Sequence, residues 1–323
     1  MILSLGTFPT PVAAPFREMP RLVVKHDDLT GELYGGNKLR KLEHLVGAAT
    51  QAGAKRLVTL GAVGSHHVLA TTLYGRREGF EVDAVLVSQP ASAHAEDNVR
   101  VSLALGLRAH AAPAWALAPP LVASLLGRDA FFVPLGGSSA AGSLGFVAAA
   151  RELAAQVRAG ELAEPDVIVV ASGSGGTVAG LAVGLELEGL RTRVIGVAVS
   201  DPVIVLRLMA LRLARATSRA AGLDRRAAAR ASARITIEGR YLGRGYGWPT
   251  EEGARATPLA AAGGVALDPT YTAKAFACAA DLVRADPRRN VVYWHTLGAK
   301  GALPRIPQGD VPARIRRLLS PTG

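Results

Sequence analysis

Residues 167–177 read Val-Ile-Val-Val-Ala-Ser-Gly-Ser-Gly-Gly-Thr, and they give the first indication of the architecture. The run of apolar, mostly β-branched residues is typical of a buried strand, and a helical stretch follows the glycines at once. Residues 167–185 carry no charged side chain, which is a feature of membrane spans. The polar glycine loop inside the stretch argues instead for a strand, a loop and a helix.

The same alternation of short apolar runs and helical stretches continues on both sides of this segment. It predicts strands at 56–60, 82–87, 131–134, 194–197 and 291–294, and helices at 65–78, 97–105, 143–159 and 177–187. Short β-branched runs separated by helices are typical of parallel sheets covered on both faces. We therefore expect an α/β protein with two open, twisted, mostly parallel sheets, which bind a ligand at the carboxyl ends of their strands.

The composition is that of a globular protein. The chain has 323 residues, of which 49% are hydrophobic and 20% charged, so disorder as the main state is excluded. Its length corresponds to about two domains of roughly 150 residues each. The single cysteine, Cys278, cannot form an intrachain disulfide and indicates a reducing compartment. The first residues do not have the pattern of a secretory signal, so we expect a cytoplasmic protein that does not bind membranes.

The net charge of +11 comes mainly from arginine, since only six of the 37 basic residues are lysines. Residues 207–234 contain eight arginines and one acidic residue, Asp224. A nucleic-acid interface would combine such charge with aromatic side chains for stacking, and this stretch has none. We therefore predict a solvated helix face there and no nucleic-acid partner.

The loop at 172–177 is suited to binding a phosphate group. Glycines allow backbone N–H groups to approach an anion, and the start of the following helix adds a favourable dipole. Val178 stands where a dinucleotide fingerprint would have its third glycine, and no lysine completes a P-loop. A bare phosphate is thus the favoured ligand, and a tight turn without a ligand is the alternative.

A second motif, Tyr-Gly-Gly-Asn-Lys-Leu-Arg-Lys-Leu-Glu at 34–43, predicts the start of another helix. Asn37 is a good N-cap, and apolar residues recur with helical spacing at 39, 42, 45 and 46. Lys38 then occupies the first helical position, where the helix dipole disfavours a cation. The same field favours the neutral amine that a Schiff-base lysine requires, whereas the alternative is a solvated lysine.

Together these motifs resemble those of the D-cysteine desulfhydrase and 1-aminocyclopropane-1-carboxylate (ACC) deaminase family. These are pyridoxal 5'-phosphate (PLP) enzymes of the tryptophan-synthase-β type, also called fold type II. The resemblance extends over about residues 10–301. Besides 35–43 and 172–177, the matching segments are 25–28, 61–67, 134–138, 245–249, 267–274 and 295–298.

The resemblance implies a role for individual residues. Lys38 would bind PLP covalently, Tyr271 would lie close to the reacting carbon with Tyr246 beside it, and Ser65 would contact the substrate carboxylate. Thr272 would face the pyridine nitrogen. The other implied cofactor-binding residues are Ser174, Gly175, Gly176 and Thr177 at the phosphate, with Asn37, Lys41, His66 and Thr296.

The resemblance also implies an arrangement of domains. A small domain, 41–148, would be inserted into a larger one made of 1–40 and 149–323, with PLP in the cleft between them. The protein would be a homodimer that acts on a small amino acid.

Two departures from the family pattern concern the substrate pocket. His66 stands where the family usually has asparagine, and one of its ring N–H groups can replace the amide donor. Gly64 replaces a glutamine, which we expect to open space. His66 and His67 are consecutive and point to different sides of a helix, so we expect no metal site.

The residue at position 272 bears on the reaction. ACC deaminases carry glutamate there, whereas a neutral threonine hydroxyl favours β-elimination. We therefore expect a lyase that converts a β-substituted amino acid such as D-cysteine to pyruvate, ammonia and sulfide. ACC deamination, or a specialised PLP enzyme with an altered pocket, is the alternative. A phosphate- or nucleic-acid-binding protein is a third hypothesis.

Overall fold

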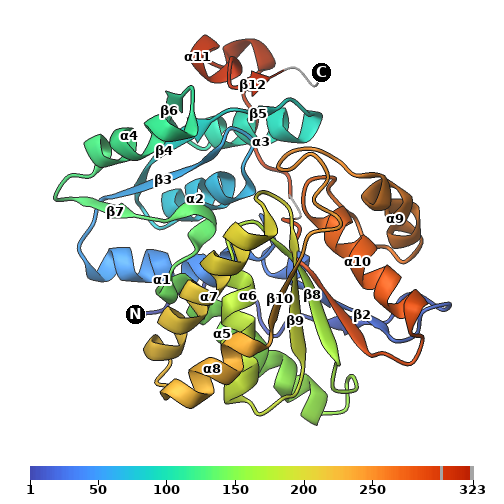
Figure 1. Cartoon of the computed structure of the whole chain (residues 1–323). Coiled ribbons are helices and arrows are strands. Elements are labelled where there is room, and N and C mark those ends of the chain that lie inside the picture. Colours follow the sequence, from blue (N-terminus) through green and yellow to red (C-terminus); the bar gives the residue numbers. More distant parts are fainter. Residues whose placement is uncertain (299–300, 321–323) are drawn as a thin grey trace. The chain divides into compact units, whose positions relative to one another are not determined.

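The computed structural model describes residues 1–298 and 301–320, which form two compact units. The larger unit comprises 6–41 and 138–298, and the smaller comprises 1–5, 42–137 and 301–320. Both are α/β (Figure 1). Helix α1 (Lys38–Gln51) begins in the larger unit and continues into the smaller.

The larger unit contains a six-stranded sheet in the order β1-β2-β11-β8-β9-β10, in which only the β1–β2 pair is antiparallel. Its strands are β1 (Val12–Ala13), β2 (Leu22–His26), β8 (Val167–Ser172), β9 (Arg193–Ala198), β10 (Ile235–Glu238) and β11 (Val291–His295). Its helices besides α1 are α5 (Ala140–Arg158), α6 (Gly176–Leu187), α7 (Val203–Ala220), α8 (Arg225–Ala233), α9 (Glu251–Ala262) and α10 (Thr272–Ala285), with a 3-10 turn, η1 (Asp27–Leu29).

Strand β8 is buried on both faces, which explains its continuous apolar run. Ile168 and Val170 pack in the core built with α5, α6 and α7. Val167 and Val169, which point to the opposite face, pack with residues of α9 and α10. Helices thus cover both faces of β8, and the loop at 173–175 follows the end of this strand (Figure 1).

The smaller unit contains a four-stranded parallel sheet in the order β6-β4-β3-β7. The strands are β3 (Arg56–Ala62), β4 (Glu81–Val87), β6 (Arg108–Ala112) and β7 (Ala130–Phe132), and β5 (Gln89–Pro90) pairs separately with β12 (Leu319–Ser320). The helices are α2 (His66–Arg77), α3 (Ala93–Ala104), α4 (Ala118–Leu125) and α11 (Ala313–Arg316), with 3-10 turns η2 (Trp115–Leu117), η3 (Leu135–Gly137) and η4 (Gln308–Asp310).

The α/β class and all of the expected strands and helices are confirmed, with shifted ends. Helix α3 begins four residues before the expected position, because Ser92 caps it by accepting a hydrogen bond from Ala95 N at 3.2 Å. Strands β2, β6 and β10 were not predicted. Strand β6 reads Arg-Ala-His-Ala-Ala and has no β-branched residue, so its strand character comes from pairing with β4.

The two units differ in their limits from the expected domains. Residues 301–320 belong to the smaller unit rather than the larger, since β12 pairs with β5 and Arg305 forms an ion pair with Asp97. Residues 1–5 also lie there, where Leu3 N donates to Glu43 O at 3.1 Å. Residues 138–148 lie in the larger unit, because α5 starts at Ala140 as one continuous helix.

The arginine-rich stretch forms α7 and α8, and seven of its eight arginines are exposed. Leu206, Ala210 and Ala214 form the buried stripe of α7, so the arginines occupy its solvated face as expected. Arg230 and Arg234 both pair with Glu186 of α6. Within residues 1–298 and 301–320, no helix combines the length and hydropathy needed to span a membrane.

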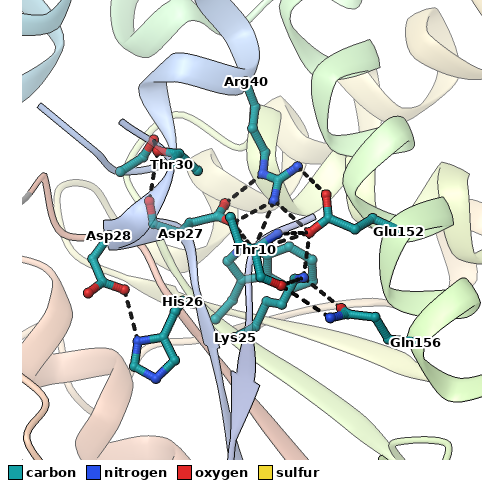
Figure 2. Close-up of polar contacts among 11 residues, drawn as sticks. Thr10, Lys25, His26, Asp27, Asp28, Thr30, Arg40, Glu152 and Gln156 are labelled. Atoms are coloured by element: carbon teal, nitrogen blue, oxygen red, sulfur yellow. Dashed lines mark hydrogen bonds and ion pairs between the residues drawn. The ribbon is translucent and has the colours of Figure 1, made fainter. Parts of the chain in front are cut away.

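A buried cluster of four charged groups holds the first turn of α1 in the larger unit (Figure 2). Arg40 donates to Asp27 through Nε at 2.9 Å and Nη2 at 2.7 Å, and to Glu152 of α5 through Nη1 at 3.0 Å. Lys25 of β2 forms an ion pair with Glu152. Trp294 Nε1 of β11 donates to Asp27 at 2.7 Å.

The cluster contains two positive and two negative charges. Its side chains are nearly inaccessible to solvent. Arg40 is 3% exposed, whereas Lys25 and Asp27 are fully buried. Burial lowers the pKa of Lys25, and the charge of Glu152 opposes that shift. Removing one member leaves a buried charge without its counter-charge, which is strongly destabilising.

Arg40→Met is therefore expected to lower the free energy of unfolding by about 3–5 kcal/mol, the range for breaking a buried ion pair. Arg284→Met is the control, because Arg284 and Asp281 form an exposed pair on α10. The control should change the stability by no more than about 1 kcal/mol. Urea denaturation followed by circular dichroism, at one fixed PLP concentration, measures both. Equal, small effects would contradict the importance assigned to the cluster.

Candidate functional site

Lys38 is the first residue of α1, as the sequence predicts. Its ammonium donates to Asn37 Oδ1 at 2.7 Å. Burial lowers its pKa to about 8, while the charge of Asp268 acts in the opposite direction. The amine is thus neutral in a larger fraction than that of an ordinary lysine, and desolvation is the main cause.

The chain before Lys38 is fixed by glycines that allow close packing. A Cβ at Gly35 would lie 1.8 Å from Asp28 O, so no side chain fits there. Gly36 has φ +99° and donates from its N to Asp27 O at 2.7 Å. A Cβ on Gly36 would lie 3.0 Å from the carbonyl oxygen of Thr296, which places the backbone of Thr296 beside this turn.

The loop between β8 and α6 forms a cradle with two other segments. Ser138 Oγ lies 2.8 Å from Ser174 Oγ, and Lys41 Nζ donates to Ser138 Oγ at 3.1 Å. A Cβ added to Gly176 would lie 2.5 Å from Ser138 Oγ and 3.0 Å from Lys41 Nζ. The missing side chain at Gly176 is therefore what keeps the cradle open.

The polar groups of this cradle fit a phosphate. Helix α6 begins at Gly176 after Gly175, which has φ +77°, so the first N–H groups of the helix point towards the cradle. Asn37 Nδ2 donates to Thr177 Oγ1 at 3.4 Å. Burial and the charge of Lys38 hold the pKa of Lys41 well below its usual value, and a phosphate dianion would compensate both ammonium groups.

Ser138 was not assigned a role from the sequence, although its segment was one of those matching the family. It follows η3, in which Gly136 and Gly137 have φ +63° and +64°. The sequence signal for this role of Ser138 was a serine directly after two glycines that follow a strand.

A buried carboxylate lies at the start of α10. Asp268 accepts hydrogen bonds from the backbone N of Thr270 at 2.9 Å, of Tyr271 at 2.7 Å and of Thr272 at 3.1 Å. It also accepts from Thr272 Oγ1 at 2.6 Å. Position 272 carries the expected neutral hydroxyl, and the carboxylate of Asp268 lies directly behind it. Its signal in the sequence was an acidic residue just before a helix.

Two tyrosines predicted for the site lie together in the larger unit. Tyr271 OH donates to Tyr246 OH at 2.6 Å. Burial raises the pKa of Tyr246 to about 12 and that of Tyr271 well above its usual value, so both hydroxyls keep their protons at neutral pH. A Cβ on Gly173 would lie 3.8 Å from the Tyr271 ring, which places the tyrosines beside the cradle loop.

Lys274 holds the loop that carries Tyr246. Its ammonium is fully buried and donates to the carbonyl oxygens of Leu242 at 2.9 Å and Gly245 at 3.2 Å. Burial lowers its pKa to about 8. No role for this lysine was predicted from the sequence.

Ser65 and His66 belong to the smaller unit, where they begin helix α2. Ser65 is the N-cap and accepts from His67 N at 3.2 Å. His66 Nε2 lies 2.5 Å from His94 Nε2 of α3, whereas His67 Nε2 lies 2.9 Å from Thr59 Oγ1 of β3. The two histidines therefore turn to different elements, as expected.

The expectation that Gly64 opens space is wrong. A Cβ at Gly64 would lie 2.4 Å from both Cα and Cβ of Ala95, so the first turn of α3 fills the place of the missing side chain. Asn98 Nδ2 donates to Gly64 O at 2.8 Å and holds this contact. The glycine serves to bring α3, and with it His94, against α2.

The sequence matches one protein-family model and is similar to enzymes that share one name. A family model described as pyridoxal-phosphate dependent enzyme matches residues 3–296. The D-cysteine desulfhydrase of Klebsiella pneumoniae (strain 342) is 36% identical over 310 residues, which are 88% of this chain and 91% of that protein. The D-cysteine desulfhydrase of Serratia proteamaculans (strain 568) is 36% identical over 321 residues, 92% of this chain and 94% of that protein.

One solved structure is similar to this chain over nearly its whole length. The crystal structure of an ACC deaminase homologue has a TM-score of 0.80 to this chain at 30% sequence identity. The match covers 98% of this chain and 96% of that one.

The cradle leads to a prediction for Gly176→Asp, which adds a negative charge where the phosphate would bind. PLP affinity should fall at least about a hundredfold, because unit charges 4 Å apart near a protein surface interact by about 4 kcal/mol. Gly176→Asn adds the same bulk without charge and should lose less. Fluorescence titration of the PLP-free protein measures both affinities. Equal losses for Asp and Asn would contradict a phosphate at this place.

Proposed function

The chain belongs to the family of pyridoxal-phosphate dependent enzymes, and on this basis we propose that it is a lyase acting on D-cysteine or a similar β-substituted amino acid. The observation that carries the proposal is the pairing of Lys38, an amine with a pKa of about 8, with the phosphate cradle built by Lys41, Ser138 and the loop at 174–177. The D-cysteine desulfhydrases at 36% identity support the substrate class.

The residues of the larger unit fit PLP. Lys38 would form the covalent link to the cofactor aldehyde, and the cradle would bind its phosphate. Thr272 would face the ring nitrogen. When bound, PLP supplies an electron sink for negative charge that develops at the substrate Cα.

The protein's own groups would move the protons. Lys38 Nζ would accept the proton that leaves the substrate Cα. The Cβ–S bond would then break with its electron pair on sulfur, and the Tyr271 hydroxyl, which keeps its proton at neutral pH, would lie beside the departing thiolate. Tyr246 is hydrogen-bonded to Tyr271 and orients it. Water completes the release of pyruvate and ammonia.

Ser65 would bind the substrate carboxylate. It is the N-cap of α2, where backbone N–H groups and the helix dipole favour an anion. His66 lies at the first helical position beside it, and His94 orients its ring.

Deamination of ACC is a second candidate. Two observations favour it: the solved ACC deaminase homologue at 30% identity, and the carboxylate of Asp268 behind Thr272. The two candidates differ in product, since D-cysteine gives pyruvate and ACC gives 2-oxobutyrate.

The proposal also includes a cytoplasmic location and a homodimeric assembly. The location is proposed because the sequence has a single cysteine, Cys278, and therefore no intrachain disulfide.

An assay of keto-acid release tests the function. The PLP-loaded enzyme should release pyruvate and sulfide from D-cysteine, with less product from L-cysteine and from ACC. Lys38→Ala should lower the turnover by about 10²–10⁴-fold, the range for loss of a general base. A loaded enzyme that releases 2-oxobutyrate from ACC and no pyruvate from D-cysteine would favour the second candidate. Release of no keto acid from any of the three substrates would contradict both.

A further inference from the structure

The larger unit contains a second pocket, at the edge of its sheet where β2, β8 and β11 begin. Its volume is about 430 Å³, which lies within the range of small-molecule sites, about 300–1,000 Å³. The residues that line it include two next to or in β2, two after α5 and two at the start of β11: Arg21, Val23, Glu161, Leu162, Asn290 and Val292. We call it the strand-start pocket.

This pocket is not part of the proposed cofactor site. Val291 pairs with Val167 on one side and with Leu22 on the other, so the three parallel strands start at one edge of the sheet. The loop at 173–175, which belongs to the phosphate cradle, follows the opposite end of β8. The six residues of β8 extend over about 20 Å, and this length separates the two places.

The early end of β1 leaves room for the pocket. Ala13, the last residue of β1, pairs with Val24. Val23 therefore has no partner on β1, and it is only half-buried. Together with the buried side chains of Leu162 and Val292 it forms an apolar floor. An aliphatic group that covers this floor would be stabilised by removal from water.

Two opposite charges line the same pocket without pairing. Arg21 donates through Nη1 to Asn290 Oδ1 at 2.6 Å, which leaves the other N–H groups of its guanidinium for a ligand. Glu161 accepts through Oε2 from Gln156 Nε2 at 2.9 Å. Within residues 1–298 and 301–320, neither Arg21 nor Glu161 forms an ion pair with the other or with a third residue.

The carboxylate of Glu161 is held in place by the interior of the unit. Gln156, which donates to it, is buried and also donates to Thr10 O at 3.1 Å. Lys25 Nζ donates to Gln156 Oε1 at 2.7 Å (Figure 2). The carboxylate is thus positioned before any ligand arrives, which reduces the entropy that binding would cost.

We propose that the strand-start pocket binds a small aliphatic amino acid in its zwitterionic form. The guanidinium of Arg21 binds the carboxylate, for which its planar set of donors is suited. Glu161 accepts hydrogen bonds from the ammonium group, and the aliphatic side chain covers Val23 and Leu162. The inference goes beyond the proposed function, because it uses no residue of the proposed cofactor site.

Isothermal titration calorimetry with L-leucine tests the proposal. The PLP-loaded enzyme is first reduced with borohydride, so that the cofactor cannot react with the added amino acid. Leucine should bind, and Glu161→Gln and Arg21→Gln should each weaken binding at least about tenfold, the effect of losing one charge-assisted hydrogen bond. Ala163→Trp should abolish binding, because Ala163 is an exposed lining residue and the larger side chain would fill the pocket.

Two ligands and two variants serve as controls. The amine 3-methylbutylamine lacks the carboxylate of leucine, and 4-methylpentanoate lacks its amine, so each should bind at least about tenfold more weakly than leucine. Glu251→Gln and Arg284→Gln change exposed charges on α9 and α10 that do not line the pocket, and they should keep the wild-type affinity.

Three results would overturn the inference. The first is no binding at millimolar leucine, and the second is equal affinity for leucine, its amine and its acid. The third is an affinity that stays unchanged in Glu161→Gln, Arg21→Gln and Ala163→Trp, since leucine would then bind elsewhere. Each of them leaves the proposed function standing. A protein without PLP can be titrated in the same way, so failure of the proposed function would not decide this inference.

Discussion

Two lysine amines, those of the partly exposed Lys38 and the buried Lys41, lie within the first turn of α1, and the rest of the site is arranged around this constraint. Burial lowers the pKa of both Lys38 and Lys41, and the charge of Lys38 lowers that of Lys41 further. Two such cations one turn apart, at the positive end of a helix, are unfavourable without an anion. The cradle at Ser138 and 174–177 offers a place for one, and in the proposed function a phosphate would supply the charge.

The buried cluster of Lys25, Asp27, Arg40 and Glu152 fixes the helix that carries Lys38 and Lys41. Arg40 lies between them in sequence and is bound by Asp27 and Glu152. Asp27 also accepts Gly36 N through its carbonyl oxygen, so one residue fixes both the turn before Lys38 and the helix after it. The position of the Lys38 amine therefore depends on ion pairs on the opposite side of its helix. Figure 2 shows that Arg40, Asp27 and Glu152 come from three different elements of the chain.

Much of the fold could be predicted from the sequence because its signals are local. The run at 167–170 and the glycines after it determine a buried strand and a turn without reference to other segments. The start of α1 at Lys38 follows from Asn37 and the helical spacing. Ser138 and His94 could not be placed this way, because their roles arise from contacts with Ser174 and His66, which lie 36 and 28 residues away in the chain. Gly64 shows most clearly what a sequence pattern does not predict. The missing side chain suggested an open space, but a residue of another helix, Ala95, fills that space.

The proposed function depends above all on Lys38 as the residue that binds the cofactor. Borohydride reduction of the PLP-loaded enzyme, followed by peptide mass spectrometry, tests it most directly, because reduction makes the link between lysine and cofactor permanent. We expect one modified peptide, with the added mass on Lys38. Modification of Lys41 or Lys274 instead, or no stable modification in a protein that contains PLP, would contradict it.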